Sequence, residues 1–218
     1  MTTSTTHSSA GGHHEPGLVL AMFEELFLKQ HALGERIFDC GDDIVRQLRS
    51  LRDTTPIPAA LRGAMGFMVY LNDHFGDRTH FRAEEAAIEL AVARGMDPAL
   101  GGWVLLQHDQ ARAYFRAMHV AWARIVSADQ QDARIARTDF WRAVEGFVLL
   151  FRQHAVREDD ELYLLLREHL RGADDDMTLR IIADFGPRDV TPYVDMVAEM
   201  ERLLAINSPN VDASPISD

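Results

Sequence analysis

Two short stretches of the sequence pair a histidine with a glutamate at the same spacing. In HFRAEE, His80 precedes Glu84 by four residues, and in HAVRED, His154 precedes Glu158 by four. Four residues make about one turn of an α-helix, so in a helix each imidazole lies beside a carboxylate on one face. Imidazole and carboxylate groups held side by side suit transition-metal ions such as iron, manganese and zinc.

The second of these pairs interrupts an apolar stripe. Hydrophobic residues recur there every three or four positions, as on the buried face of a helix: Val144, Phe147, Val148, Phe151, Leu162, Leu165 and Leu166. His154 and Glu158 continue this stripe, so the pattern places both of them in the protein core.

Three other predicted helices also direct a histidine inward. His108 lies within the apolar stripe of the third helix, and His31 lies one turn after Phe27 in the first. His80 and Glu84 lie on the second helix, which is apolar over more of its surface. An ionised carboxylate in an apolar core costs several kcal/mol unless it is paired or bound to a cation. This convergence of polar groups therefore indicates a metal site.

Six residues are the candidate metal ligands: His31, His80, Glu84, His108, His154 and Glu158. Four imidazoles and two carboxylates suit two ions that share both glutamates, with two histidines on each ion and an oxo or hydroxo bridge between them. Each ion would be five-coordinate, with a position left for a small ligand. Arg112, one turn after His108, is the basic residue near these stripes, and it can neutralise only part of the charge.

Competing metal motifs are missing from the sequence. No histidine has a glutamate three residues before it, as in ferritin-like carboxylate bundles, and the zinc-protease motif His-Glu-x-x-His does not occur. The single cysteine, Cys40, excludes an internal disulfide and a cysteine-built metal site. His74, His119 and His169 point elsewhere or lie too far along their helices, so we expect them at the surface or at the edge of the core.

Breaks at proline and glycine divide the chain into six predicted helices, and no segment alternates with the period of a strand. The predicted ranges are 17–51, 58–95, 98–127, 131–170, 177–186 and 191–205. The four long helices predict an all-α, antiparallel up-and-down four-helix bundle, against which the two shorter C-terminal helices pack. Asp97 before Pro98 and Thr191 before Pro192 predict the starts of two helices.

Length and composition are consistent with one helical domain. We expect that domain at 17–206, with the core bundle at 17–170, a disordered tail at 1–16 and a second tail at 207–218. The formal charge of −12 argues against nucleic-acid binding and against a polybasic membrane anchor. No stretch approaches the roughly 20 apolar residues of a membrane span, and the N-terminus lacks a secretion signal. We therefore expect a cytoplasmic protein that binds neither nucleic acid nor a membrane.

The six candidate ligands, in their order along the chain, resemble those of the hemerythrin-like, or HHE cation-binding, family. The segments HFRAEEAAIEL and HAVREDDELYLLL are similar to the two diagnostic segments of that family. The resemblance covers residues 17–170. It implies a four-helix bundle that holds a non-haem di-iron centre, in which zinc or manganese could replace the iron.

The third helix differs from that of the oxygen-carrying hemerythrins, because Arg112 stands where their His-x-x-x-His pattern has its second histidine. Four histidines and two glutamates are similar instead to the di-iron domain of the repair-of-iron-centres proteins. They also resemble the iron- and oxygen-sensing domain attached to an F-box in ubiquitin ligases. The sequence contains neither an F-box nor the cysteine-bearing N-terminal domain of the repair type. In size it most resembles stand-alone bacterial members linked to peroxide and nitric oxide stress.

The resemblance leads to two alternative functions. In the first, the di-iron centre reacts with peroxide, nitric oxide or dioxygen in a stress response. In the second, a non-enzymatic module senses oxygen or iron and acts through a partner protein. A bundle with a polar core and no metal is a third reading. Tyr70 and Asp77 are candidates for orienting the ligands, although Tyr70 is also explained as a core residue.

Overall fold

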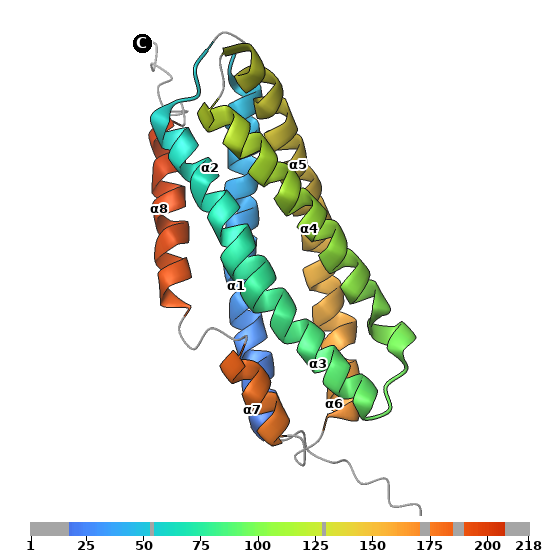
Figure 1. The fold of residues 1–218 in the computed structure, drawn as a ribbon. Coiled ribbons are helices and arrows are strands. Elements are labelled where there is room, and N and C mark those ends of the chain that lie inside the picture. The colour runs from blue at the N-terminus through green and yellow to red at the C-terminus, as the bar shows by residue number, and fades with distance from the viewer. Residues whose placement is uncertain (1–17, 53–54, 128–129, 171–174, 185–189, 208–218) are drawn as a thin grey trace, which may run out of the picture.

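The computed structural model describes residues 18–52, 55–127, 130–170, 175–184 and 190–207 (Figure 1). Every regular element in these segments is a helix, which confirms the all-helical class predicted from the sequence. The tails predicted at 1–16 and 207–218 lie outside the described residues, apart from Asn207 at the end of the last helix.

Four long helical segments run along the molecule (Figure 1). They are α1 (Leu18–Ser50); the continuous run α2 (Ala59–Leu71), η1 (Asn72–Phe81) and α3 (Arg82–Ala93); α4 (Pro98–Ser127); and the run α5 (Gln130–Arg157), η2 (Glu158–Leu162) and α6 (Tyr163–His169). Their ends lie close to the predicted breaks. The sequence pattern does not predict η1 and η2, which are π-helical. In a π-helix the backbone bonds join residues five apart, and such turns are frequent at functional sites.

Local signals in the sequence explain how α3 ends and α4 begins. Gly95 has a φ of 103°, and the amide of Met96 bonds to the carbonyl of Ala91 at 3.0 Å. This is the backbone geometry of a Schellman motif, which glycine adopts without strain. Asp97 Oδ1 then accepts a hydrogen bond from the amide of Ala99 at 2.9 Å, so the predicted cap of α4 is confirmed.

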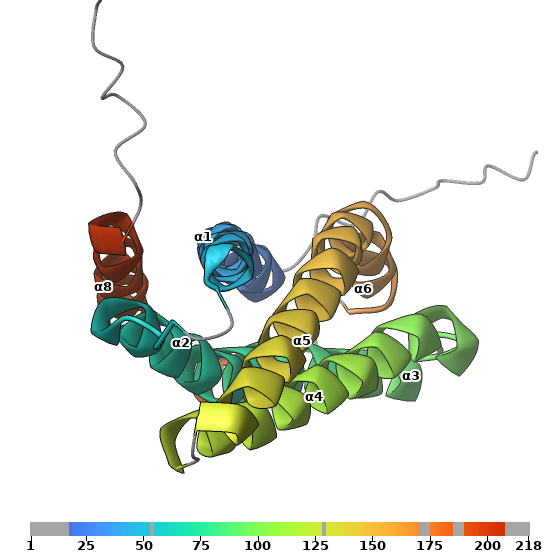
Figure 2. The ribbon, with the colours of Figure 1, turned by 90° about the horizontal axis from the view of Figure 1, so that it is seen from above.

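The long segments pack against one another, and the two C-terminal helices lie outside them. α5 lies along α4 and also contacts α1, while α2 and η1 contact α4. The C-terminal helices α7 (Asp175–Asp184) and α8 (Thr191–Asn207) pack outside these segments, α7 on α1 and α3, and α8 on α1 and α2. Figure 2 shows α8 beside α2, on the side away from α4. None of the helices in the described ranges combines the length and apolar character needed to cross a bilayer.

The buried side chains form two apolar clusters, and the buried histidines contact both of them. His108 stacks on Phe81 of the larger cluster, with 4.1 Å between ring centroids. His80 lies 5.4 Å from Phe27 of the smaller cluster. The core is therefore divided by a polar layer, and this layer contains the candidate ligands.

Candidate metal centre

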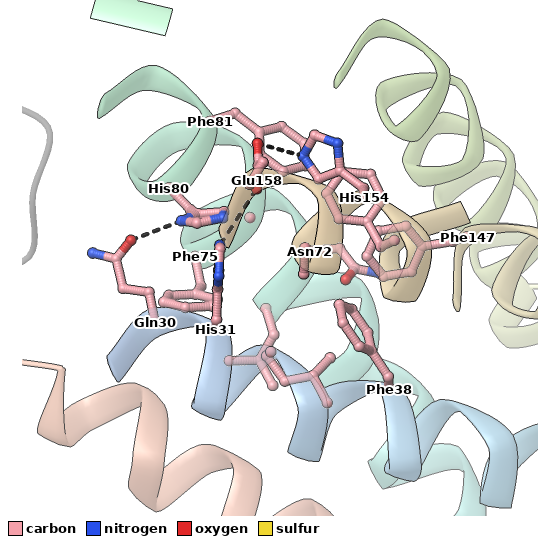
Figure 3. Close-up of a pocket in the computed structure, with 16 residues that line it drawn as sticks. Gln30, His31, Phe38, Asn72, Phe75, His80, Phe81, Phe147, His154 and Glu158 are labelled. Carbon is pink, nitrogen blue, oxygen red and sulfur yellow. Dashed lines mark hydrogen bonds and ion pairs between the residues drawn. The ribbon is translucent and has the colours of Figure 1, made fainter. Parts of the chain in front are cut away.

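All four long segments contribute to one buried cluster of imidazoles and carboxylates. α1 supplies His31, η1 supplies His80, α3 supplies Glu84, α4 supplies His108, α5 supplies His154 and η2 supplies Glu158. Figure 3 shows His31, His80, His154 and Glu158 turned toward one another. Both glutamate side chains are fully buried, and His31, the most accessible of the six, has only 10% of its side chain exposed. The structure thus brings together every ligand predicted from the sequence.

Each histidine turns Nε2 toward a glutamate oxygen. The shortest separations are 3.4 Å for His31–Glu158, 3.6 Å for His80–Glu84, 3.3 Å for His108–Glu84 and 2.8 Å for His154–Glu158. Two ligands on one ion at about 2.0–2.2 Å from it lie roughly 3 Å apart. The donor atoms therefore have the spacing of atoms that share a metal ion.

The donor atoms form two overlapping sets, each with all atoms within 4.8 Å of one another. The first set comprises His31, His80, Glu84 and Glu158, and the second comprises Glu84, His108, His154 and Glu158. Both sets contain both glutamates. The cluster could therefore hold a metal ion, and Glu84 and Glu158 are placed to contribute to either set.

Polar atoms in the cluster lack conventional partners. All four carboxylate oxygens of Glu84 and Glu158 are buried with no hydrogen-bond partner in the described structure, and so are Nε2 of His108 and Nε2 of His154. Leaving one buried polar atom unpaired costs about 1–3 kcal/mol, and more for a charged group. A cation contacted by these atoms would satisfy all of them. The residues present therefore fit a bound metal.

Burial and mutual contact shift the pKa values of the cluster in opposite directions. Burial opposes protonation of His31 and His108, but contacts with carboxylates outweigh it and raise their pKa values to about 10 and about 9. Burial, assisted by the charge of Glu158, raises the pKa of Glu84 to about 8. Burial and the charge of His31 lower the pKa of His80. Without metal, the cluster balances its charge by retaining protons that a cation would displace.

Arg112 contacts carboxylates at the outer side of the cluster. Its Nε lies 2.7 Å from Asp77 Oδ1, and its terminal nitrogens lie 2.7 Å from Glu85 Oε1 and 3.3 Å from Asp109 Oδ1. Asp77, predicted to orient a ligand, thus meets Arg112. Arg112 therefore forms ion pairs with these three residues, and the residues beside Glu84 and Glu158 are the histidines.

The structure corrects the prediction for Tyr70 and adds a residue. Tyr70 is 41% exposed, and its ring stacks on His74 at 3.9 Å, so it neither orients a ligand nor belongs to the core. The prediction assumed α-helical spacing from Tyr70 to His80 and Glu84, and it fails because the intervening η1 is π-helical and has more residues per turn.

Tyr163 is a residue near the cluster that the sequence did not predict. It lies five residues after Glu158, a spacing that the π-helical η2 brings onto one face. Its hydroxyl lies 3.4 Å from His31 Nε2.

The three histidines that were predicted to lie elsewhere belong to neither donor set. His74 Nδ1 contacts the carbonyl of Tyr70, His169 Nδ1 contacts that of Leu165, and His119 is exposed. They lie at the surface or at the edge of the core, as the sequence predicts.

A small cavity opens beside the cluster (Figure 3). Its volume is about 40 Å³, and its lining includes His31, His80, His154 and Glu158 among mostly apolar residues. Such a volume admits a few molecules the size of water. The cavity therefore suits a small ligand and is too small for a metabolite.

No protein-family model, curated protein or solved structure matches this chain.

Proposed function

We propose that this chain is a hemerythrin-like protein whose four long segments form a four-helix bundle around two iron ions. Its function is to react with small oxidants, namely peroxide, nitric oxide or dioxygen, in oxidative or nitrosative stress. One observation carries the metal assignment. Two overlapping donor sets share Glu84 and Glu158, whose oxygens are buried without hydrogen-bond partners in the described structure.

The donor atoms determine which residues would hold each ion. His31 and His80 belong to one set and His108 and His154 to the other, while the glutamates belong to both. Imidazole and carboxylate donors suit iron, and also manganese and zinc. Iron, when bound, supplies the electron transfer that reaction with oxygen species requires. The chain's own contribution is to hold the donors in place and to keep bulk water away from them.

The size and lining of the cavity support a small oxidant as the ligand. About 40 Å³ accommodates dioxygen, nitric oxide or peroxide, and the apolar lining favours uncharged molecules. Four residues of the cluster line this space, so a ligand inside it lies next to the donors.

A second candidate function, an iron or oxygen sensor, is favoured by the position of α1. This helix supplies His31 to the cluster, and both α7 and α8 pack on it. Occupancy of the cluster would then affect how firmly α1 is held and, through α1, the C-terminal helices that a partner protein could recognise.

Anaerobic loading with ferrous iron tests the proposal. We expect close to two iron ions per chain by elemental analysis, and near-ultraviolet and visible absorption of bridged ferric ions after oxidation. Rapid turnover of peroxide would favour the enzyme, whereas stoichiometric oxidation without turnover would favour the sensor. Failure to retain iron after removal of excess metal would refute the assignment.

A further inference from the structure

The outward-facing nitrogen of each candidate histidine has its own partner. The Nδ1 contacts are His31 with Asp159 at 3.0 Å, His80 with Gln30 at 2.8 Å, His108 with Glu85 at 3.2 Å, and His154 with Gln107 at 2.8 Å. The dashed line from Gln30 in Figure 3 marks one of them. In every case the partner atom is a carboxylate or amide carbonyl oxygen, which only accepts hydrogen bonds. Each Nδ1 therefore donates its proton outward, and the lone pair of a neutral ring lies on Nε2, facing the cluster.

These contacts repeat between two halves of the molecule, one made of α1 and the α2–α3 run and the other of α4 and the α5–α6 run. A glutamine stands directly before a histidine ligand on α1 and on α4, and an acidic residue directly follows each glutamate ligand: Gln30-His31, Gln107-His108, Glu84-Glu85 and Glu158-Asp159. In each half, the glutamine holds the histidine of the His-x-x-x-Glu helix beside it. Each acidic residue holds the histidine that follows a glutamine. Exchanging α1 with α4, and the α2–α3 run with the α5–α6 run, reproduces all four contacts.

The inward contacts of His31 and His108 repeat under the same exchange. His31 Nε2 lies 3.4 Å and 3.9 Å from the two glutamates, and His108 Nε2 lies 3.3 Å and 3.9 Å from them. The rings of His31 and His80 have centroids 5.1 Å apart, as do those of His108 and His154. The outer partners are thus part of one repeated design that includes the ligands.

Stability alone does not explain the glutamine on α1. Gln30 is fully buried, and its amide nitrogen has no hydrogen-bond partner among the described residues. Burying an amide group half-satisfied costs free energy that an apolar side chain of similar size avoids. The side-chain hydrogen bond that Gln30 makes in the described structure is the one that its carbonyl oxygen accepts from His80. The geometry therefore assigns this residue to the histidine.

We infer that Gln30, Gln107, Glu85 and Asp159 are positioning residues that fix the orientation of the four imidazoles and keep Nε2 of each available to a metal ion. In each donor set, one histidine has a neutral amide partner and the other has an anionic partner. This inference rests on the proposed function in one respect only, namely that the inward atoms bind metal. Partners that orient metal-bound histidines commonly change metal affinity by 10–100-fold when they are replaced.

Zinc affinity, measured by competition with a chromophoric chelator, tests the assignment without redox chemistry. Gln107→Met removes the acceptor for His154 and keeps the volume, and it should weaken zinc binding by roughly 10–100-fold. Gln107→Glu retains an acceptor oxygen and should restore most of the affinity. Gln110→Met, one turn away on the exposed side of α4, is the matched control and should bind like the unaltered protein.

The anionic partners are tested in the same way. Asp159→Leu removes the acceptor for His31, whereas Asp159→Asn keeps an acceptor oxygen without the charge. The first should lose roughly tenfold or more in zinc affinity, and the second should lose less. Asp160→Leu and Asp160→Asn, at the neighbouring exposed position, should have no effect.

Imidazole NMR of the metal-free and zinc-loaded protein separates this inference from the proposed function. The Nδ1 proton of His154 should be protected from exchange in both forms and should lose that protection in Gln107→Met alone. If the unaltered protein shows this protected proton yet binds no metal, the proposed function is wrong, and what stands is that Gln107 orients the His154 ring. Equal zinc affinity and an equally protected proton in Gln107→Met would overturn the positioning role, while leaving the metal centre intact.

Discussion

His154 Nε2 lies 2.8 Å from Glu158 Oε1, one helical turn along the same segment. Both side chains are almost completely buried, yet neither of these atoms has a hydrogen bond of acceptable geometry in the described structure. Such a short contact without alignment is typical of two ligands that approach a common third atom. The pair is therefore the most direct place to test whether a cation belongs between them.

Replacing His154 should therefore remove metal from the protein. We expect His154→Ala or Glu158→Ala to reduce the metal content from about two ions per chain to one or none, because His154 belongs to one set of four donors and Glu158 belongs to both. Elemental analysis after gel filtration measures the loss.

His119→Ala is the matched control for the loss of an imidazole. His119 is exposed on α4 and belongs to neither donor set, so this variant should retain its metal and its colour. Loss of metal from His119→Ala together with retention by His154→Ala would show that the ligands are assigned incorrectly.

Metal should stabilise the fold. The folded chain presents six donors in one place and the unfolded chain does not, so a metal at 100 times its dissociation constant adds about 2.7 kcal/mol of stability. For a chain of this size the melting temperature should rise by roughly 5–10 °C for each ion bound at that concentration. Calorimetry of metal-free and loaded protein measures the difference.

Amide exchange should locate this stabilisation. We expect faster exchange around residues 80–84 and 154–158 in the metal-free protein, and the greatest loosening in α1, whose His31 is the most accessible of the six candidate ligands. Equal melting temperatures for the two forms, with iron confirmed in the loaded sample, would show that the buried glutamates are already satisfied without a cation.

The metal-free protein should lose stability as the pH rises, whereas the loaded protein should not. In the folded metal-free chain the pKa values of His31, His108 and Glu84 are raised to about 10, 9 and 8. The folded state thus binds more protons than the unfolded state, and its stability falls as the pH rises from about 6.5 toward 10. Metal must displace these protons, so its affinity for the folded chain should rise over the same interval. The stability of the loaded form should rise only slightly, as the histidines of the unfolded chain lose their protons near pH 6.5, and should then stay level.

Melting curves of both forms at pH 6.5, 7.5 and 8.5 measure this divergence. We expect the metal-free protein to lose at least about 1 kcal/mol, or roughly 2–4 °C, across this interval. Parallel curves would show that the raised pKa values do not govern the stability of the cluster.

The clustering of the candidate ligands was predictable because the four-residue spacing of histidine and glutamate agrees with the helical spacing of the apolar residues around them. His154 and Glu158 continue an apolar stripe with helical spacing, and both prove to be buried at the centre of the fold. The start of α4 was predictable for a similar local reason, since an Asp-Pro pair combines a cap with a favourable first residue. Such signals depend on neighbouring residues, and the sequence contains them directly.

The hydrogen-bond partners of the candidate ligands were not predictable, because they depend on contacts between segments. Gln30 meets His80 fifty residues later, and Gln107 meets His154 forty-seven residues later. No periodicity in one helix identifies such a pair. Tyr163 was missed for another reason, since its face is set by a π-helical turn that the apolar pattern does not reveal. The repeated Gln-His dipeptide was the signal available in the sequence.

Dioxygen adducts of the iron-loaded protein should be short-lived. Under the proposed resemblance, Arg112 occupies the position of a fifth histidine in the oxygen-carrying hemerythrins. Its guanidinium contacts Asp77 and Glu85 and has no lone pair to offer a metal ion. More coordination remains open as a result, which favours reaction over reversible binding. Repeated cycles of oxygenation and degassing, followed by absorption, measure the lifetime. A spectrum that returns unchanged through many cycles would contradict the proposed reactivity.

Narrowing the cavity should slow the reaction with small oxidants and leave the metal in place. Gly34 lines the cavity, and a methyl group added there would lie 3.6 Å from the ring of Phe38, in ordinary contact. Gly34→Ala therefore fits the fold, and as a change from glycine inside α1 it should stabilise the helix by about 0.5–1 kcal/mol. The methyl group also occupies part of a space of about 40 Å³. We expect nitric oxide affinity to fall by about 1 kcal/mol, roughly fivefold, and peroxide consumption to slow accordingly.

Gly102→Ala is the matched control for this change. Gly102 lies within α4, and a methyl group added there meets nothing within 4 Å, so the helix gains the same propensity without any change in the cavity. Both variants should retain the iron content of the unaltered protein, and only Gly34→Ala should react more slowly. Equal rates in the two variants would mean that oxidants reach the cluster by another route. A loss of iron from Gly34→Ala would mean instead that the methyl group displaces the donor atoms. His31 lies on the preceding turn of α1 and also lines the cavity, so a shift there would reach the cluster.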